Sequence, residues 1–168
     1  MNYHSITYPD LNNGVGLRVT LWLSGCDNKC KNCHNPQTWD KNSGTIFDNA
    51  AKRKLFDILS KNYIDGITFS GGDPLHKNNI IEVNTLIDEI RVKYPEKTIW
   101  LFTGNTLEDI YKEESIRKEI IKKCNVLVDG RFVEEQKDLS LAWRGSKNQR
   151  VIDIQKTLSN GEITLYTE

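Results

Sequence analysis

The chain contains 168 residues, in which 23 Lys and Arg are balanced by 23 Asp and Glu, so its formal net charge is zero. This balance argues against nucleic acid or an anionic membrane as a partner, because both attract proteins with a marked excess of basic residues. The length suits one hydrophobic core, so we expect a single domain over residues 1–168. No signal-like or membrane-spanning stretch is apparent, and we predict a soluble, cytoplasmic protein.

Alternating apolar residues predict the first strand at residues 15–23, after a turn at residues 12–14. Helically spaced apolar residues predict a helix over residues 48–62, with Asp48 or Asn49 as its N-cap. The same two patterns predict a strand at 66–69, a helix that starts near Ile80 and stops before Pro95, a strand at 98–102, a helix at 107–123, and strands at 125–128, 149–154 and 163–166.

The strand and helix patterns alternate four times, which predicts βαβ units, a largely parallel sheet and right-handed crossovers. A closed barrel of eight such units needs about 250 residues, more than this chain has. We therefore expect an α/β fold in the form of a partial (βα) barrel with a curved, mostly parallel sheet.

Polar or glycine-rich segments follow four of the predicted strands. They are the cysteine-rich segment 26–36, Ser70–Asp73, Thr103–Gly104 and Asp129–Arg131. Ligands of parallel α/β sheets collect at the carboxyl ends of the strands. We therefore expect these four segments to share one rim and to form a binding site there.

Three cysteines, Cys26, Cys30 and Cys33, lie within eight residues directly after the first predicted strand. Thiolates suit zinc, copper or iron-sulfur clusters. Structural zinc usually takes four protein ligands, and the adjacency of His34 to Cys33 makes joint ligation awkward. A 4Fe-4S cube held by three cysteines leaves one iron open, as catalysis requires. The distant Cys124 is expected to be a semi-buried structural thiol.

Together these motifs resemble the radical S-adenosylmethionine (SAM) superfamily and, more narrowly, the activating proteins of anaerobic ribonucleoside-triphosphate reductase. The resemblance runs from about residue 14 to residue 153. It is carried by Gly-Leu-Arg at 16–18, the cysteine triad with Cys-His-Asn-Pro at 33–36 and Trp39, Ser-Gly-Gly-Asp-Pro-Leu at 70–75, Val-Asp-Gly-Arg-Phe at 128–132, and Trp-Arg-Gly-Ser with Asn-Gln-Arg-Val-Ile-Asp at 143–153. Asn32 stands where many superfamily members have an aromatic residue, a departure that the reductase-activating family tends to share.

The resemblance implies that Cys26, Cys30 and Cys33 hold a 4Fe-4S cluster whose open iron binds the amino and carboxylate groups of SAM. No side chain is assigned a catalytic role, because the cluster and SAM carry the chemistry. The residues expected around SAM are Ser70, Gly71, Gly72 and Asp73, with His34 and Asn35 beside the adenine or the cluster, and Asp129 and Arg131 as further contacts.

Structural roles remain open for several of these residues. Asp73 with Pro74 also fits a turn or a helix start, and a salt bridge is as plausible for Asp129 and Arg131. Arg144 and Arg150, in the last two motifs, are either contacts to a partner or the site, or surface cations.

The resemblance further implies a reaction. An electron from a flavodoxin-like protein cleaves SAM to methionine and a 5'-deoxyadenosyl radical, which takes a hydrogen from a backbone glycine of the large subunit of anaerobic ribonucleoside-triphosphate reductase. One alternative is the activation of another glycyl-radical enzyme such as pyruvate formate-lyase, which the motifs at 128–132 and 143–146 disfavour. Another is a non-catalytic zinc-binding assembly module, which accounts for the thiols but not for Ser70–Asp73 or the alternating elements.

Overall fold

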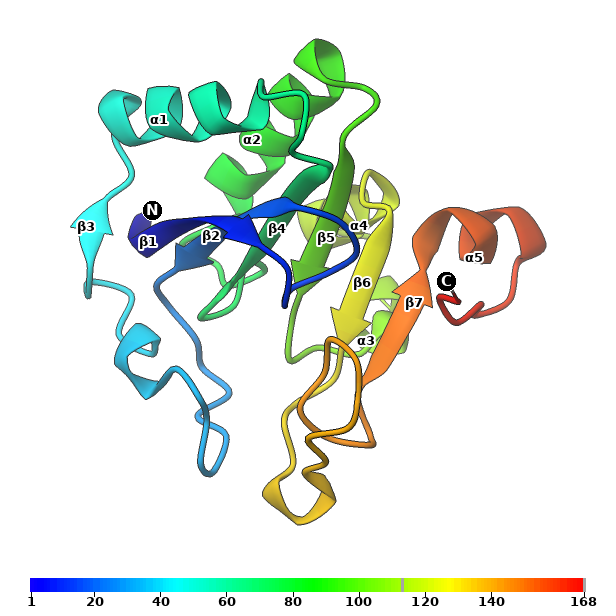
Figure 1. The fold of residues 1–168 in the computed structure, drawn as a ribbon. Coiled ribbons are helices and arrows are strands. Elements are labelled where there is room, and N and C mark those ends of the chain that lie inside the picture. The colour runs from blue at the N-terminus through cyan, green and yellow to red at the C-terminus, as the bar shows by residue number, and fades with distance from the viewer. Residues whose placement is uncertain (113, 168) are drawn as a thin grey trace.

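The computed structural model describes residues 1–112 and 114–167, which form a mixed α/β fold around one seven-stranded sheet (Figure 1). The strands are β1 (Asn2–Asp10), β2 (Arg18–Leu23), β3 (Thr45–Ile46), β4 (Gly66–Gly71), β5 (Thr98–Phe102), β6 (Val126–Asp129) and β7 (Arg150–Asp153). The helices are α1 (Asn49–Leu59), α2 (Ile80–Lys93), α3 (Leu107–Tyr111), α4 (Ile116–Lys122) and α5 (Ile154–Asn160), with 3-10 turns at Pro36–Thr38 and Glu134–Gln136.

The four central strands of the sheet are parallel. The order is β3-β1-β2-β4-β5-β6-β7; β2, β4, β5 and β6 pair in parallel, and β1, β3 and β7 pair antiparallel at the two edges. The predicted α/β class and the parallel centre of the sheet are therefore confirmed. In Figure 1 the arrowheads of β4, β5 and β6 point to the same lower edge, below which the loops after β2 and β6 extend.

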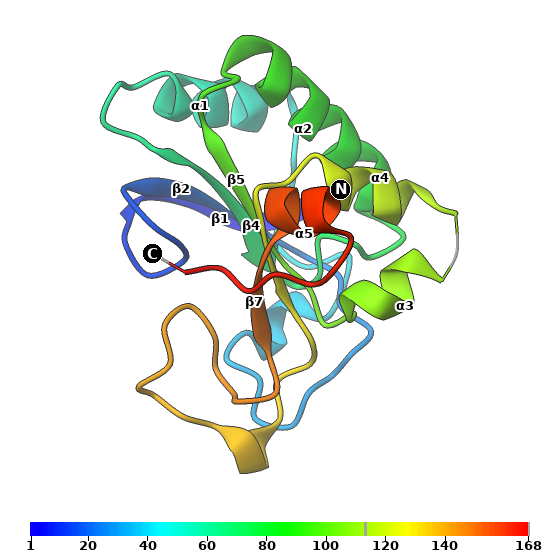
Figure 2. The ribbon, with the colours of Figure 1, turned by 90° about the vertical axis from the view of Figure 1, so that its right-hand side faces the viewer.

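The larger hydrophobic core lies between the sheet and its helices. Fully buried residues meet there from the strands (Leu21, Phe69 and Leu101) and from the helices (Leu55 and Ile87). Figure 2 shows α1, α2 and α4 on the same side of the sheet. Because side chains alternate along a strand, every second residue of the parallel strands points to the opposite face.

On the opposite face of the sheet, the fully buried Arg18 lies where the parallel strands begin. Its Nε donates to the Thr68 hydroxyl at 2.8 Å, and its terminal nitrogens donate to the hydroxyl and the carbonyl of Thr98 at 2.8 and 3.0 Å. The guanidinium also lies over the Trp100 ring, 5.5 Å from its centroid. Burial lowers the pKa of Arg18 to about 10. Arg18 thus joins β2, β4 and β5 at the start of the strands.

Three elements were not predicted from the sequence. β1 pairs with both β2 and β3, yet Ile6 is its one hydrophobic residue that is buried, so its sequence shows little alternation. β3 has only two residues, both exposed. α5 begins directly at the end of β7, where the side chain of Asp153 caps it by accepting a hydrogen bond from the N–H of Lys156.

Two predicted elements were wrong in extent. The helix expected at 107–123 is divided into α3 and α4, because Ser115 is extended and starts a new helix; residue 113 of that prediction lies outside the described residues. The strand expected at 163–166 is reduced to one bridge between Ile152 and Leu165. By contrast, Asp48 caps α1 as predicted, accepting a hydrogen bond from the N–H of Ala51 at 2.9 Å.

Within residues 1–112 and 114–167, no helix has both the length and the apolar character required to cross a bilayer.

Candidate functional site

The loops that follow the four parallel strands meet at one edge of the sheet, as predicted. They are the cysteine loop (residues 24–39) after β2, residues 72–79 after β4, residues 103–106 after β5 and the long loop (residues 130–149) after β6. They contact one another directly: the N–H of Asp73 donates to the carbonyl of Gly25 at 2.7 Å, and the N–H of Gly130 donates to the carbonyl of Asn105 at 3.2 Å. The rim is therefore a set of interlocked loops.

The cysteine loop is closed at its base and turns tightly between its thiols. The N–H of Cys26 donates to the carbonyl of Trp39 at 3.1 Å. Lys29 and Asn32 have φ angles of 46° and 55°, in the left-handed region that non-glycine residues adopt in tight turns. These turns allow three thiols that are close in sequence to line the same hollow, namely those of Cys26, Cys30 and Cys33.

All three thiols are free and partly buried. Nδ2 of Asn28 lies 3.6 Å from Sγ of Cys26, and the backbone N–H of Asn35 donates to Sγ of Cys33 at 3.4 Å. Burial raises the pKa of the Cys26 thiol, and N–H donors from Asn28 oppose that shift. Donors of this kind stabilise negative charge on a ligand sulfur.

The two glycines of the Ser-Gly-Gly-Asp motif permit two strands to end in close contact. Gly71 has a φ of 102°, and a Cβ there would lie 2.5 Å from the backbone nitrogen of Leu23. At Gly72 a Cβ would lie 2.5 Å from the carbonyl oxygen of Gly25. A side chain at Gly71 would push the end of β4 away from β2, and one at Gly72 would separate the loop after β4 from the cysteine loop, so both glycines serve the backbone packing of the rim.

Asp73 is only 4% exposed and is surrounded by donors from three loops. One carboxylate oxygen accepts from the N–H of Leu75 at 2.9 Å, and both oxygens accept from the Thr103 hydroxyl at 2.9 and 3.0 Å. The second oxygen also lies within 3.3 Å of the Gly104 nitrogen and of Nδ2 of Asn28. Burial raises the pKa of Asp73, while the donors from Leu75, Thr103 and Gly104 oppose the shift. The carboxylate therefore ties the cysteine loop to the loops after β4 and β5.

Two adjoining cavities lie along this rim. The smaller, of about 130 Å³, contains the three cysteines together with Gly71, Gly72, Thr103, Gly104, Gly130 and Arg131 in its wall. The larger, of about 390 Å³, lies between the strands and the long loop. Both cavities share Cys33, Ser70, Phe102, Phe132 and Gln149. A ligand held at the thiols would consequently face the larger cavity.

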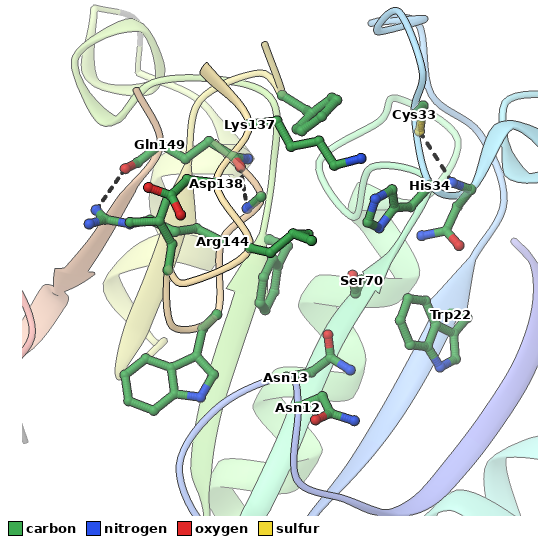
Figure 3. Close-up of a pocket in the computed structure, with 17 residues that line it drawn as sticks. Asn12, Asn13, Trp22, Cys33, His34, Ser70, Lys137, Asp138, Arg144 and Gln149 are labelled. Carbon is green, nitrogen blue, oxygen red and sulfur yellow. Dashed lines mark hydrogen bonds between the residues drawn. The ribbon is translucent and has the colours of Figure 1, made fainter. Parts of the chain in front are cut away.

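Figure 3 shows how the larger cavity is built. Trp22 and Ser70 enter it from β2 and β4, and Asn12 and Asn13 come from the turn before β2. Lys137, Asp138, Arg144 and Gln149 line the facing side, from the long loop. His34 and Asn35, both from the cysteine loop, line the cavity beside Cys33, whereas Asp73 belongs to neither wall. The volume of the larger cavity lies within the usual range for small-molecule sites.

Asp129 is buried at the end of β6 and pairs with Arg150 of β7. Nε and a terminal nitrogen of Arg150 donate to the two Asp129 oxygens at 3.0 and 2.5 Å, and the same guanidinium binds Glu108. Asp129 also accepts from the N–H of Leu107 at 2.9 Å. Hydrogen bonding to Arg150 lowers the pKa of Glu108 to about 2. A salt bridge for Asp129 is thus present, with Arg150 and not Arg131 as the partner.

The other two arginines of the motifs after β6, Arg131 and Arg144, lie at the cavities. Arg131 is exposed and lines the smaller cavity. Arg144 lines the larger one, and one of its terminal nitrogens donates to the carbonyl of Gln149 at 2.9 Å. Both cations therefore lie where an anionic group of a ligand or partner can reach them.

The long loop is anchored at both of its sides. Phe132 lies against His34 of the cysteine loop, with ring centroids 6.1 Å apart. Trp143 has a φ of 56°, and its ring packs edge-on against Trp100 and Tyr166, with centroids at 5.2 and 6.0 Å. A left-handed tryptophan is uncommon and is retained only when packing compensates for its backbone. The aromatic cluster fixes the wall of the larger cavity.

Comparisons with known proteins assign this arrangement to a family. A family model described as a 4Fe-4S single cluster domain matches residues 12–152. The chain is 42% identical over 153 residues to the anaerobic ribonucleoside-triphosphate reductase-activating protein of Escherichia coli K12, covering 90% of this chain and 97% of that protein. The chain belongs to the anaerobic ribonucleoside-triphosphate reductase-activating protein family. Relatives of the same name from phage T4 and Haemophilus influenzae are 40% and 38% identical over 151 residues, and the matches cover 90% and 89% of this chain and 93% and 96% of theirs.

The cavity at the thiols fits the cluster that the family model names. Three free thiols line it, and two of them receive N–H donors. Trp39 lines the same cavity, and its buried indole N–H has no hydrogen-bond partner among the described residues. Among residues 1–112 and 114–167, no three His, Cys, Asp or Glu side chains are grouped as they would be around a single metal ion. Three cysteine ligands with N–H donors nearby suit an iron-sulfur cluster.

Sequence patterns missed several residues of this family site. Asn28 had no signal beyond its place between the first two cysteines, although it contacts both Cys26 and Asp73. Gln149 lines both cavities and holds the long loop closed by accepting from the N–H of Gly145 at 2.9 Å. The turn at Thr103 was placed on the rim, but its bond to Asp73 could not be derived from spacing.

Proposed function

We propose that this chain reductively cleaves SAM and generates the glycyl radical on the large subunit of anaerobic ribonucleoside-triphosphate reductase. The observation that supports this most is the placement of three free thiols in a cavity that adjoins a second, larger cavity on the rim of a parallel sheet. The relatives' shared name supplies the reductase as partner. The same evidence disfavours a zinc assembly module and an activase of pyruvate formate-lyase.

Cys26, Cys30 and Cys33 are the residues that would hold a 4Fe-4S cluster. When bound, such a cluster supplies the single electron that reductive cleavage of SAM requires. The chain itself orients the thiolates: the tight turns of the cysteine loop place them in one cavity, and Asn28 and Asn35 donate to two of the sulfurs. Partial burial limits the access of water to these groups.

SAM would span the two cavities. Ser70 is common to both and offers its hydroxyl, and Gly71 and Gly72 present backbone without a side chain. His34 and Asn35 border the larger cavity, where the adenosyl part would lie. The Asp73 carboxylate is engaged by neutral donors of the protein, so its main proposed role is to hold the rim around SAM. Asp129 would likewise support the rim through Arg150, while Arg131 remains a proposed contact.

The reductase would present its glycine at the larger cavity. This cavity lies on the sheet face opposite the helices, between β2 and the long loop, and extends to Cys33. A partial (βα) barrel of the radical SAM type, with an open side, suits a substrate that is itself a loop of a protein. A flavodoxin-like electron donor, a cytoplasmic location and a single domain over residues 1–168 complete the proposal.

Electron paramagnetic resonance (EPR) provides the direct test. The anaerobically prepared protein is reduced and mixed with SAM and the large subunit of the reductase, and spectra are recorded for a glycyl radical. We expect the radical to form only when all components are present, together with 5'-deoxyadenosine. A protein that binds zinc but no iron, and forms no 5'-deoxyadenosine, would refute the proposal.

A further inference from the structure

The Asn28 side chain lies between a cluster cysteine and a buried carboxylate. Its Nδ2 lies 3.6 Å from Sγ of Cys26 and 3.3 Å from an oxygen of Asp73. Sulfur and carboxylate oxygen are both acceptors here, so they orient the carboxamide with its NH₂ group toward them. One hydrogen of that group then serves the sulfur and the other serves the carboxylate.

The loop after β5 contains a slot for this side chain. A Cβ at Gly104 would overlap Nδ2 of Asn28 and would lie 2.7 Å from its Cγ. The backbone N–H of Gly104 points to the same Asp73 oxygen, at 3.3 Å. Only glycine at residue 104 leaves room for the Asn28 amide, so Gly104 accommodates that side chain in addition to forming a turn.

Asp73 is itself held in place independently of Asn28. The Leu75 N–H and the Thr103 hydroxyl fix its carboxylate from the loops after β4 and β5. The Asn28 amide is consequently attached to a fixed point, which restricts rotation of its side chain. An amide held in this way can keep an N–H directed at a sulfur. An asparagine in an unrestrained loop would instead turn away and form hydrogen bonds with water.

We propose that Asn28 is a positioning residue that sets the reduction potential of the cluster through Cys26. This inference rests on the proposed function, because it requires the cluster. Adding an electron makes a cluster more negative, and an N–H donor to a ligand sulfur stabilises that state more than the oxidised one. The donor therefore raises the potential, and its loss makes the cluster harder to reduce.

The test is a redox titration of anaerobically reconstituted protein without SAM, followed by EPR, with iron and sulfide analysis of every sample. Asn28→Ala removes the donor, and Gly104→Ala retains every donor but displaces the amide. Asn32→Gly is the matched control, because it removes a carboxamide from the same loop, where Asn32 is exposed and its φ of 55° suits glycine. We expect the ratio of reduced to oxidised cluster at a fixed potential to fall on the order of tenfold in the first two variants, which corresponds to about 59 mV for a one-electron couple.

Unchanged potentials in iron-loaded Asn28→Ala and Gly104→Ala would overturn the inference and leave the proposed function intact. A shift of equal size in Asn32→Gly would overturn it as well, since any change in the loop would then have the same effect. If Asn28→Ala does not retain iron, Gly104→Ala alone decides. A wild-type protein that assembles no iron-sulfur cluster is a different result and contradicts the proposed function itself.

Discussion

Substitution of Asp73 by alanine separates a rim-holding role from a ligand role. The change removes the acceptor from two donors that lie in fully buried bonds, the Leu75 N–H and the Thr103 hydroxyl. Each unsatisfied buried donor costs about 1–3 kcal/mol, which gives about 2–6 kcal/mol for the two. Burial of the carboxylate itself is unfavourable, as its raised pKa indicates, and its removal offsets part of that cost. We expect a net loss of about 2–4 kcal/mol.

The assay is urea unfolding of the cluster-free protein, so that the result does not depend on iron. With a slope of about 2 kcal/mol per molar urea, the midpoint should fall by about 1–2 M. Asp73→Asn should be intermediate, because its one carbonyl oxygen can still accept from Leu75 or Thr103 while its NH₂ group faces other donors. Asp57→Ala is the control: this carboxylate is 78% exposed and lies 3.8 Å from Lys61. Its loss should cost less than about 0.5 kcal/mol.

The outcome for SAM completes the comparison. If Asp73→Ala unfolds at the same urea concentration as Asp57→Ala but binds SAM much more weakly, the carboxylate is a ligand of the SAM ammonium and the tie between loops is unimportant. If stability falls as calculated, and affinity for SAM falls only together with iron retention, the carboxylate acts by holding the rim.

Further predictions concern the thiols and an acid-sensitive ion pair. Cys26→Ala should prevent stable cluster assembly, measured by iron and sulfide content, whereas Cys124→Ala should leave reductive SAM cleavage largely intact; equal loss in both would contradict the assignment. Burial raises the pKa of Cys124 to about 12, so iodoacetamide at pH 8 should modify it only after unfolding, as mass spectrometry can show. The pKa of Glu108 is depressed from 4.5 to about 2, so its stabilising effect is present above pH 4.5 and is lost as the pH falls toward 2. The difference in urea midpoint between wild type and Glu108→Gln should shrink over that range, and a constant difference would refute the pairing with Arg150.

The parallel centre of the fold could be predicted because its signals are local. The apolar residues of β2, β4, β5 and β6 form a recognisable pattern because these strands lie in the buried centre of the sheet. The observed bounds of β5 coincide with the predicted ones. β1 could not be found in this way, because most of its residues are either partly buried or exposed and its pairing depends on a distant partner. The antiparallel direction of β7 was not predicted either, because the loop at 130–149 is longer than the roughly dozen residues that a parallel crossover needs, and its length therefore allows both directions.

The site was predictable as a set of loops but not as a network of bonds. The order of the strands places the cysteine loop and the Ser-Gly-Gly-Asp motif on one rim, and the structure brings them together. The hydrogen-bond partners of a side chain depend on how deeply it is buried and on which way it points, and neighbouring residues in the sequence do not determine either. Asp129 shows this clearly: Arg131 is the nearest cation in sequence, yet Arg150 across the β6–β7 pair is the one that binds it.

Two buried charges define the sheet at its opposite ends, and both are met chiefly by neutral groups. Arg18 gathers hydroxyls and carbonyls where β2, β4 and β5 begin, and Asp73 gathers N–H and O–H donors where the loops after the same strands meet. A bond between a charge and a dipole is directional, so one charge with several neutral partners fixes the spacing of several strands at once. The cysteine loop is joined to Asp73 at two points, by the Asn28 amide and by the Gly25 carbonyl, which accepts from the N–H of Asp73. The reactive edge is therefore positioned by the sheet, and changes at Thr103 or Gly104 should disturb the thiols without touching them.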